Sequence, residues 1–249
     1  MDKNYFQTYF DLRDIPAYGC PVCNKGMLVK ESHLADSTAA TKRATDQGCR
    51  EGWWEPEYEE SIFRVDFKCS HCDELVFAIG DGFIEQEHDV DGNGNWERYW
   101  VNYYRPKHFW PSLKFIDCPL ATPSEVKRHI EASSALYYSH PAASCNSMRM
   151  AAEEVLNALG VERSTKENYI SLGNRIKLLP EESSEYALLD AIRWLGNDGS
   201  HSDSIINHTD VESAFSIMEL LVDELYSDRK HKVKEMAARI REHRGPVRR

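Results

Sequence analysis

The sequence lacks any apolar run of the roughly 20 residues that a membrane-spanning helix needs. Its first residues, MDKNYFQTYFDLRD, contain neither the basic nor the apolar segment of a signal peptide. No repeat of solenoid length is visible, and Lys and Arg are too few to balance the acids, 30 against 41. We therefore expect a cytoplasmic protein with no membrane partner. Its 249 residues are enough for two modest cores.

The basic residues are concentrated at the C-terminal end. Residues 228–249 contain nine Lys/Arg and three Asp/Glu, which gives +6 and leaves −17 for residues 1–227. An acidic body repels nucleic acid at long range, so a polyanion would meet this tail or a local basic patch. The simpler interpretation is a solvated helical tail over 229–249.

The two halves of the chain have different hydrophobic patterns. The first half has short alternating segments typical of antiparallel strands, such as Phe63, Val65 and Phe67. The second half has amphipathic segments that predict four or five helices with short connections. We therefore predict an α+β protein, with a zinc-ribbon-like β-rich domain over 1–110 and an antiparallel helical bundle over 118–228.

Several local signals refine this prediction. Capping boxes predict helix starts at Thr122–Glu125 and Thr209–Glu212. Further helices are expected over about 142–159, ending at Gly160, over about 167–179, and up to about Gly196. The segment 34–52 predicts a loop insertion or a polar helix. The run Asp-Val-Asp-Gly-Asn-Gly-Asn at 89–95 resembles the start of a calcium loop, but its Asn-Gly dipeptide favours a hairpin turn.

Four of the seven cysteines form two Cys-x-x-Cys pairs, Cys20/Cys23 and Cys69/Cys72. Two thiolates in a tight turn can bind one tetrahedral metal, and two such turns complete a four-sulfur shell. We predict one structural zinc ion here, with His71, His33 and Cys49 as substitutes if one thiolate does not bind. A redox pair or plain core cysteines are the alternatives, and Cys118 and Cys145 are expected to be interior residues.

A second cluster lies in the helical half, in the sequence Arg-Trp-Leu-Gly-Asn-Asp-Gly-Ser-His at 193–201. If the helix continues past Gly196, Arg193, Asn197 and His201 share one face and could hold a phosphodiester. His201 would act as general acid or base, Arg193 would stabilise phosphoryl charge, and Asn197 would orient a group. Arg149 and Glu153, on an earlier helix, are supporting candidates.

The alternative interpretation of this cluster is structural. Asn197 and Gly199 would form the turn that ends the helix, and His201 would hydrogen-bond a carbonyl there. Arg193 would then pair with Glu153 or with another nearby acid.

At these residues the sequence resembles a bacterial family known as domain of unknown function 4145, within the HEPN group of helical nucleotide-binding domains. The similarity runs from about Pro106 to Tyr226 and is strongest over 193–201. It implies a helical bundle that dimerises, often beside a zinc module in restriction or phage-defence proteins. HEPN ribonucleases have an arginine, a polar residue and then a histidine. Here Gly196 stands at the arginine position, and seven residues separate Arg193 from His201.

These observations lead to three hypotheses of function. The first is a metal-independent endoribonuclease of a defence or toxin system, homodimeric through the bundle. The second is a non-catalytic zinc-and-bundle module that binds nucleic acid or a partner protein in such a system. The third is a regulator that senses a nucleotide at the dimer interface.

Overall fold

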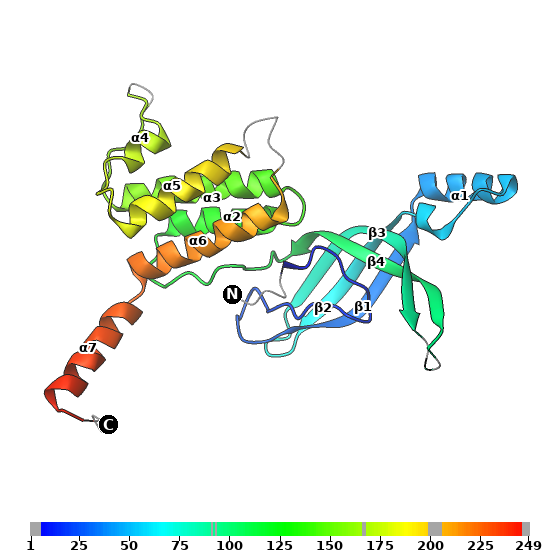
Figure 1. The fold of residues 1–249 in the computed structure, drawn as a ribbon, viewed down its shortest axis with the longest axis horizontal. Helices are drawn as coiled ribbons and strands as arrows, with labels where there is room; N and C mark the ends of the chain where they lie inside the picture. The colour runs from blue at the N-terminus through cyan, green and yellow to red at the C-terminus, as the bar shows by residue number, and fades with distance from the viewer. Residues whose placement is uncertain (1–5, 91, 93, 166–167, 199–205, 246–249) are drawn as a thin grey trace. The chain divides into compact units, whose positions relative to one another are not determined.

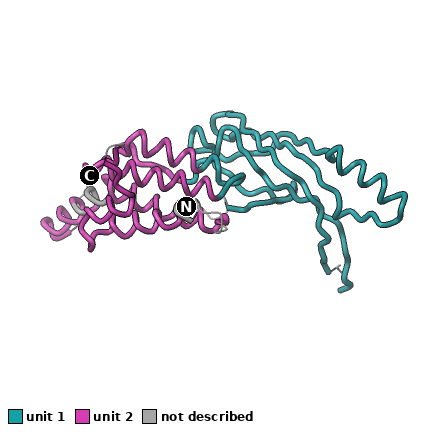
Figure 2. The backbone as a smooth tube through the Cα atoms, turned by 90° about the horizontal axis from the view of Figure 1, so that it is seen from above, with its two compact units in different colours: residues 1–115, 134–141 teal, residues 116–133, 142–249 magenta. Residues whose placement is uncertain are grey.

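The computed structural model divides the chain into two compact units (Figures 1 and 2). The N-terminal unit contains residues 1–115 and 134–141, and the C-terminal unit contains 116–133 and 142–249. The structure describes the chain except residues 1–5, 91, 93, 166–167, 199–205 and 246–249; at 197–198, 229–232 and 234 it describes the backbone only.

The N-terminal unit is built on one antiparallel sheet with strand order β1-β2-β3-β4. The strands are β1 (Leu28–Ser37), β2 (Ser61–Cys69), β3 (Leu75–Val90) and β4 (Trp96–Trp110). Phe63, Val65 and Phe67 are all buried on one face, as their alternation predicts. Residues 34–37, which the sequence assigned to a loop or polar helix, instead complete β1, where Ala35 lies opposite Phe63.

Aromatic side chains fill the core beside this sheet. The segment before β1 adds one bridge to the sheet, between Phe10 and Tyr104. Tyr18, fully buried, packs edge-on against Phe67 and Phe109 at ring separations of 6.1 and 5.0 Å. Residues 134–141 belong to the same core, because Tyr138 packs on Phe109 at 5.1 Å.

Two connections in this unit match predictions from local sequence. Helix α1 (Ala39–Glu51) is the polar helix, capped by the Thr38 hydroxyl and ended by Gly52 in the left-handed region at φ +77°. The run at 89–95 joins β3 and β4, with Val90 opposite Trp96, so it is a hairpin connection and not a calcium loop. A short 3₁₀ turn, η2 (Pro56–Tyr58), precedes β2.

Helices make up the C-terminal unit, and α5 packs on α6. Their bounds are α2 (Ser124–Leu136), α3 (Pro141–Ala158), α4 (Leu172–Ile176), α5 (Ser184–Asp198), α6 (His208–Tyr226) and α7 (Arg229–Glu242). A sheet followed by helices confirms the predicted α+β class. Helix α3 ends near Gly160 as expected, with Gly160 at φ +76°. No helix in the described part of the chain is long and apolar enough to cross a membrane.

Three helix starts differ from prediction. The capping box of α6 is formed by Asn207 and Asp210. The side-chain oxygen of Asn207 accepts from the backbone N–H of Asp210, and the Asp210 carboxylate accepts from the backbone N–H of Asn207. At α2, the Thr122 hydroxyl is buried and makes no hydrogen bond among the described residues, so the predicted box does not form. Helix α4 is much shorter than predicted, since Ser171 caps its first turn.

Candidate metal centre and the arginine cluster

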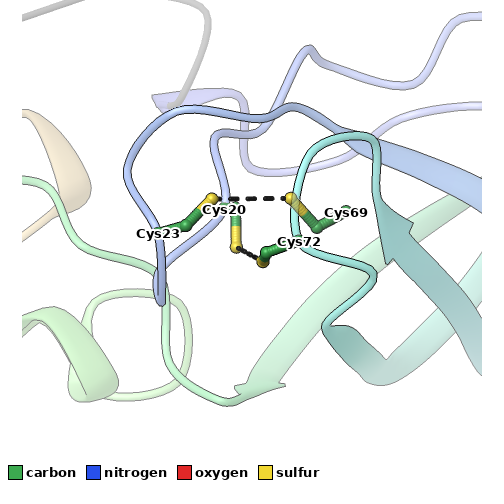
Figure 3. A group of neighbouring side chains, drawn as sticks. All are labelled: Cys20, Cys23, Cys69 and Cys72. Atoms are coloured by element: carbon green, nitrogen blue, oxygen red, sulfur yellow. Dashed lines mark hydrogen bonds between the residues drawn. The ribbon is translucent and has the colours of Figure 1, made fainter.

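Two loops of the N-terminal unit bring together Cys20, Cys23, Cys69 and Cys72 (Figure 3). The first pair precedes β1, and the second begins at the last residue of β2 and continues into the turn before β3. All four Sγ atoms lie within 4.8 Å of one another. The Cys20–Cys72 and Cys23–Cys69 sulfur pairs are each 3.7 Å apart. The sheet therefore closes the 45-residue separation between the pairs through the pairing of β1 with β2.

This sulfur geometry fits zinc. Four ligands at about 2.3 Å from a tetrahedral ion stand about 3.8 Å from one another. The observed 3.7 Å separations match that spacing and are far longer than a disulfide bond of about 2.05 Å. Four thiolates leave no open coordination position, so a metal held here stabilises the fold and activates no water.

The two loops share one backbone design. Asn24 and Asp73, each directly after the second cysteine of its pair, are in the left-handed region at φ 52° and 59°. Their N–H groups donate to the carbonyls of Cys20 and Cys69 at 3.1 and 3.2 Å. Asn and Asp tolerate this conformation better than other residues with a Cβ, so both turns bend tightly enough for two sulfurs to face one ion.

Backbone N–H groups point at the sulfurs and favour the thiolate form. Hydrogen bonds from the N–H of Gly26 and then of Lys25 lower the pKa of Cys23 to about 6. The more buried Cys20 behaves in the opposite way, because desolvation raises the pKa of its thiol. The positive charge of a bound ion would therefore favour deprotonation of Cys20.

The cysteine cluster requires a residue without a side chain at position 26, and Gly26 meets this requirement. A Cβ at position 26 would lie 2.5 Å from Cys69 Sγ and 2.7 Å from His71 Cβ. We therefore expect Gly26→Ala to displace the second loop and to weaken zinc binding by at least about tenfold. Competition with a chromogenic chelator measures that affinity. Gly92→Ala is the control, since a Cβ there meets nothing within 4 Å, and equal affinities for the two variants would contradict the prediction.

The alternatives raised for these cysteines find less support. Each pair leads into a strand, not into the helix N-terminus that activates a redox cysteine. His33 lies within β1 opposite Val65, and Cys49 is exposed on α1. His71 contributes its backbone N–H, which donates to Cys69 Sγ at 3.4 Å. Among the described residues, the metal-binding group consists of the four cysteines.

The remaining cysteines differ in burial. Cys145 is buried in α3, and burial raises the pKa of its thiol to about 12, as expected of an interior residue. Cys118 is half-buried.

The second candidate site lies on α5 of the C-terminal unit, which continues past Gly196 to Asp198. Arg193 donates to Asp190 through Nε at 2.8 Å, and its guanidinium lies over the Trp194 ring, 4.1 Å from the centroid. Arg193 therefore pairs with an acid of its own helix and not with Glu153. Asn197 is within α5, but its side chain and His201 lie outside what the structure describes.

Arg149 occupies a position that sequence spacing did not reveal. A Cβ at Gly196 would lie 2.6 Å from Arg149 Cβ and 2.9 Å from its Cδ, so α3 crosses α5 closely at this glycine. Arg149 Nη1 pairs with Glu153 Oε1 at 3.3 Å. Its Nε is buried and has no acceptor among the described residues. The sequence signal for this contact was a glycine in the interior of an amphipathic helix.

Comparison with known protein families gives one match in each half of the chain. Residues 130–243 match the family described as Domain of unknown function (DUF4145). This match supports the resemblance seen at 193–201, but it starts later than Pro106 and extends beyond Tyr226 into α7. Residues 8–109 match a second family, described as Domain of unknown function (DUF8608). Comparison with curated proteins and with solved structures gave no match.

The DUF4145 match contains Arg149 and Arg193, and the DUF8608 match contains all four clustered cysteines. Neither description specifies a metal, a ligand or a reaction. The functional argument therefore depends on the residues themselves.

Proposed function

We propose that the protein is a HEPN-like endoribonuclease of a prokaryotic defence or toxin system. Its N-terminal unit would be held by a zinc ion, and its C-terminal unit would bind the phosphodiester at α3 and α5. The observation that carries the proposal is the contact of Arg149 with Gly196. The HEPN pattern has an arginine where this chain has Gly196, and Arg149 from α3 passes across that position.

Arg149 is well placed to bind an anion. A guanidinium has five N–H donors, and the ion pair with Glu153 engages Nη1. Nε is buried, so an anion would meet the terminal nitrogens. The Arg149 side chain is only 25% exposed, which strengthens its interaction with a phosphate relative to a fully solvated arginine. Glu153 fixes the orientation of the guanidinium through the i,i+4 pair.

Arg193 would have a supporting role in this scheme. Its side chain is 17% exposed and fixed by Asp190, and it lies against Gly173 of α4, where a Cβ would meet the Arg193 side chain at 3.4 Å. Arg193 would therefore add positive potential beside Arg149, with one of its donors committed to Asp190.

The reaction would not need the zinc ion, whose four thiolates leave no open position. His201 would accept the proton of the ribose 2′-hydroxyl, or give a proton to the leaving 5′-oxygen, and solvent water would exchange the other proton. The 2′-oxygen would form a bond to phosphorus as the bond to the 5′-oxygen breaks, giving a 2′,3′-cyclic phosphate and a 5′-hydroxyl. Arg149 would stabilise the charge that develops on the phosphoryl oxygens.

Cleavage of total RNA or tRNA without added divalent metal tests the proposal. We expect Arg149→Ala and His201→Ala each to reduce the rate by about 100-fold or more, whereas Arg128→Ala, an exposed arginine on α2, should leave it unchanged. Arg149→Lys should recover only part of the rate, because an ammonium group cannot make a bidentate hydrogen-bonded contact with the phosphate. Cleavage that persists in both alanine variants would contradict the assignment.

A second candidate function is a non-catalytic module that binds nucleic acid or a partner protein. The observation that favours it is that Arg149 and Arg193 each already pair with an acid on their own helix. This candidate predicts RNA binding without turnover in the same experiment. Sedimentation of the intact chain would test the expected homodimer.

A further inference from the structure

The strands β3 and β4 continue beyond the rest of their sheet as a two-stranded ribbon. Strand β2 pairs with β3 only as far as Gly82, opposite Ser61, whereas β3 and β4 stay paired to Val90 and Trp96. Residues 84–90 and 96–102 form this ribbon, and its projection past the other strands is visible in Figure 1. An isolated two-stranded ribbon buries little, so its side chains are available to a ligand.

The two faces of the ribbon carry opposite chemistry. Directly opposed residues of an antiparallel pair share a face, so the register assigns each side chain to one of them. The first face carries no carboxylate and consists of Ile84, Gln86, His88, Val90, Trp96, Arg98, Trp100 and Asn102. The second face carries all four acids of the described ribbon, Glu85, Glu87, Asp89 and Glu97. We call the first face the tryptophan face.

The tryptophan face exposes large aromatic surface to solvent. Trp96 is 75% exposed and Trp100 is 39% exposed, with the exposed Arg98 between them on the same strand. Because the four acids of the described ribbon lie on the second face, the tryptophan face attracts an anion even though the whole chain is acidic. Two indoles with an arginine between them fit a ligand that has both flat rings and negative charge.

A cleft lies at the base of the ribbon, where the segment before β1 runs along the edge of β4. It has a volume of about 260 Å³ and lies between Asp11–Arg13 and Trp100–Asn102. Arg13 pairs with Asp11 at 3.2 Å, and its side chain is 70% exposed. Arg13 interacts electrostatically with Tyr99, which lies on the acid-bearing face of the ribbon, so the Asp11–Arg13 pair lies toward that face and places no carboxylate on the tryptophan face.

We propose that the tryptophan face binds single-stranded nucleic acid by stacking bases on Trp96 and Trp100, with Arg98 contacting the phosphates between them. The two tryptophans are four residues apart, or about 13 Å along the strand. Adjacent bases in a duplex are about 3.4 Å apart. Bases that stack on both indoles must be separated from their neighbours, which a single strand permits and a duplex resists.

This inference goes beyond the endoribonuclease proposal, because it concerns the N-terminal unit and requires no cleavage. The two proposals can fail separately if the probe cannot be cleaved. A fluorescently labelled oligo(dT) lacks the 2′-hydroxyl that the proposed reaction uses. An oligo(U) probe, used with the His201→Ala chain, tests whether the site also accepts RNA.

Fluorescence anisotropy of the full-length chain with these probes tests the inference. We expect Trp96→Ala/Trp100→Ala to weaken oligo(dT) binding by at least about tenfold. Arg98→Ala should reduce the slope of log affinity against log salt by about one. Trp110→Ala is the matched control: Trp110 is 74% exposed on the same strand, outside the ribbon, and its loss should leave binding unchanged.

Three results would overturn the inference. They are no oligo(dT) binding by the wild type, an equal loss in Trp110→Ala, and duplex DNA bound as tightly as the single strand. A dimer that dissociates in the double variant, with no change in oligonucleotide affinity, would instead assign the tryptophan face to self-association. Zinc content and the thermal transition of each variant confirm that it has folded.

Discussion

Removal of zinc is expected to unfold the N-terminal unit while most of the C-terminal helices persist. The four thiolates draw together loops that lie 45 residues apart, and deprotonated cysteines that lose their ion repel one another. Structural zinc sites contribute on the order of 10 kcal/mol in small domains, which exceeds the stability of most units of this size. Chelation should therefore cause a cooperative loss of the sheet.

Two spectroscopic signals separate the two units in that experiment. Five of the six tryptophans, all except Trp194, lie in the N-terminal unit, so tryptophan emission reports mainly on the sheet. The far-ultraviolet helical signal comes mostly from α2 to α7. We expect emission to shift to longer wavelength on chelation, while most of the helical signal remains.

The structure also places a limit on how much helical signal should survive. Residues 134–141, which include the end of α2, belong to the N-terminal core. The Tyr137 hydroxyl donates to the Phe6 carbonyl at 3.2 Å, and its ring lies 4.8 Å from that of Phe115. Unfolding of the sheet should therefore release the end of α2 as well as α1.

The cysteine variants provide the control. Cys69→Ser should abolish stoichiometric zinc, as measured by elemental analysis, and should reproduce the effect of chelation. Cys49→Ser should retain one zinc ion per chain, since Cys49 is exposed on α1 outside the cluster. An unchanged thermal transition in Cys69→Ser would show that the sheet does not depend on a metal.

Arg175→Met is expected to lower the stability of the C-terminal unit by about 2–4 kcal/mol. Arg175 is 3% exposed, and it donates through Nε to the Glu162 carbonyl at 2.8 Å and through Nη2 to Asn157 Oδ1 at 2.7 Å. Burial lowers the pKa of the guanidinium, because removal from water disfavours its charged form. The hydrogen bonds of Arg175 therefore offset this desolvation cost. Methionine fills a similar volume but leaves both acceptors without a donor.

Thermal unfolding followed by the helical signal measures this loss, which should lower the melting temperature by about 10 °C. Arg163→Met is the matched control. Arg163 is exposed in the same connection, and its positive charge opposes that of Arg175, so its removal should leave stability unchanged or slightly raised. Equal melting temperatures for the Arg175 variant and the wild type would show that water satisfies both acceptors.

The sequence by itself determined the features that depend on local spacing. The four clustered cysteines follow from two Cys-x-x-Cys turns, because thiolates at that spacing can face one ion whatever lies between the turns. The α+β class follows from the change in hydrophobic period between the halves of the chain. Gly160 and the hairpin between β3 and β4 were predictable because a glycine with positive φ, or a short connection, is a property of a few neighbouring residues.

Only the tertiary structure decided the features that depend on contacts between distant segments. The contact of Arg149 with Gly196 joins positions 47 residues apart, and no local pattern encodes which side chain crosses a glycine. The capping box of α6 was misplaced by two residues because two overlapping polar runs satisfy the same rule. The tryptophan face also depends on contacts between distant residues. Alternation predicts two faces, but only the register of β3 with β4 shows that the four acids of the described ribbon all lie on the other one.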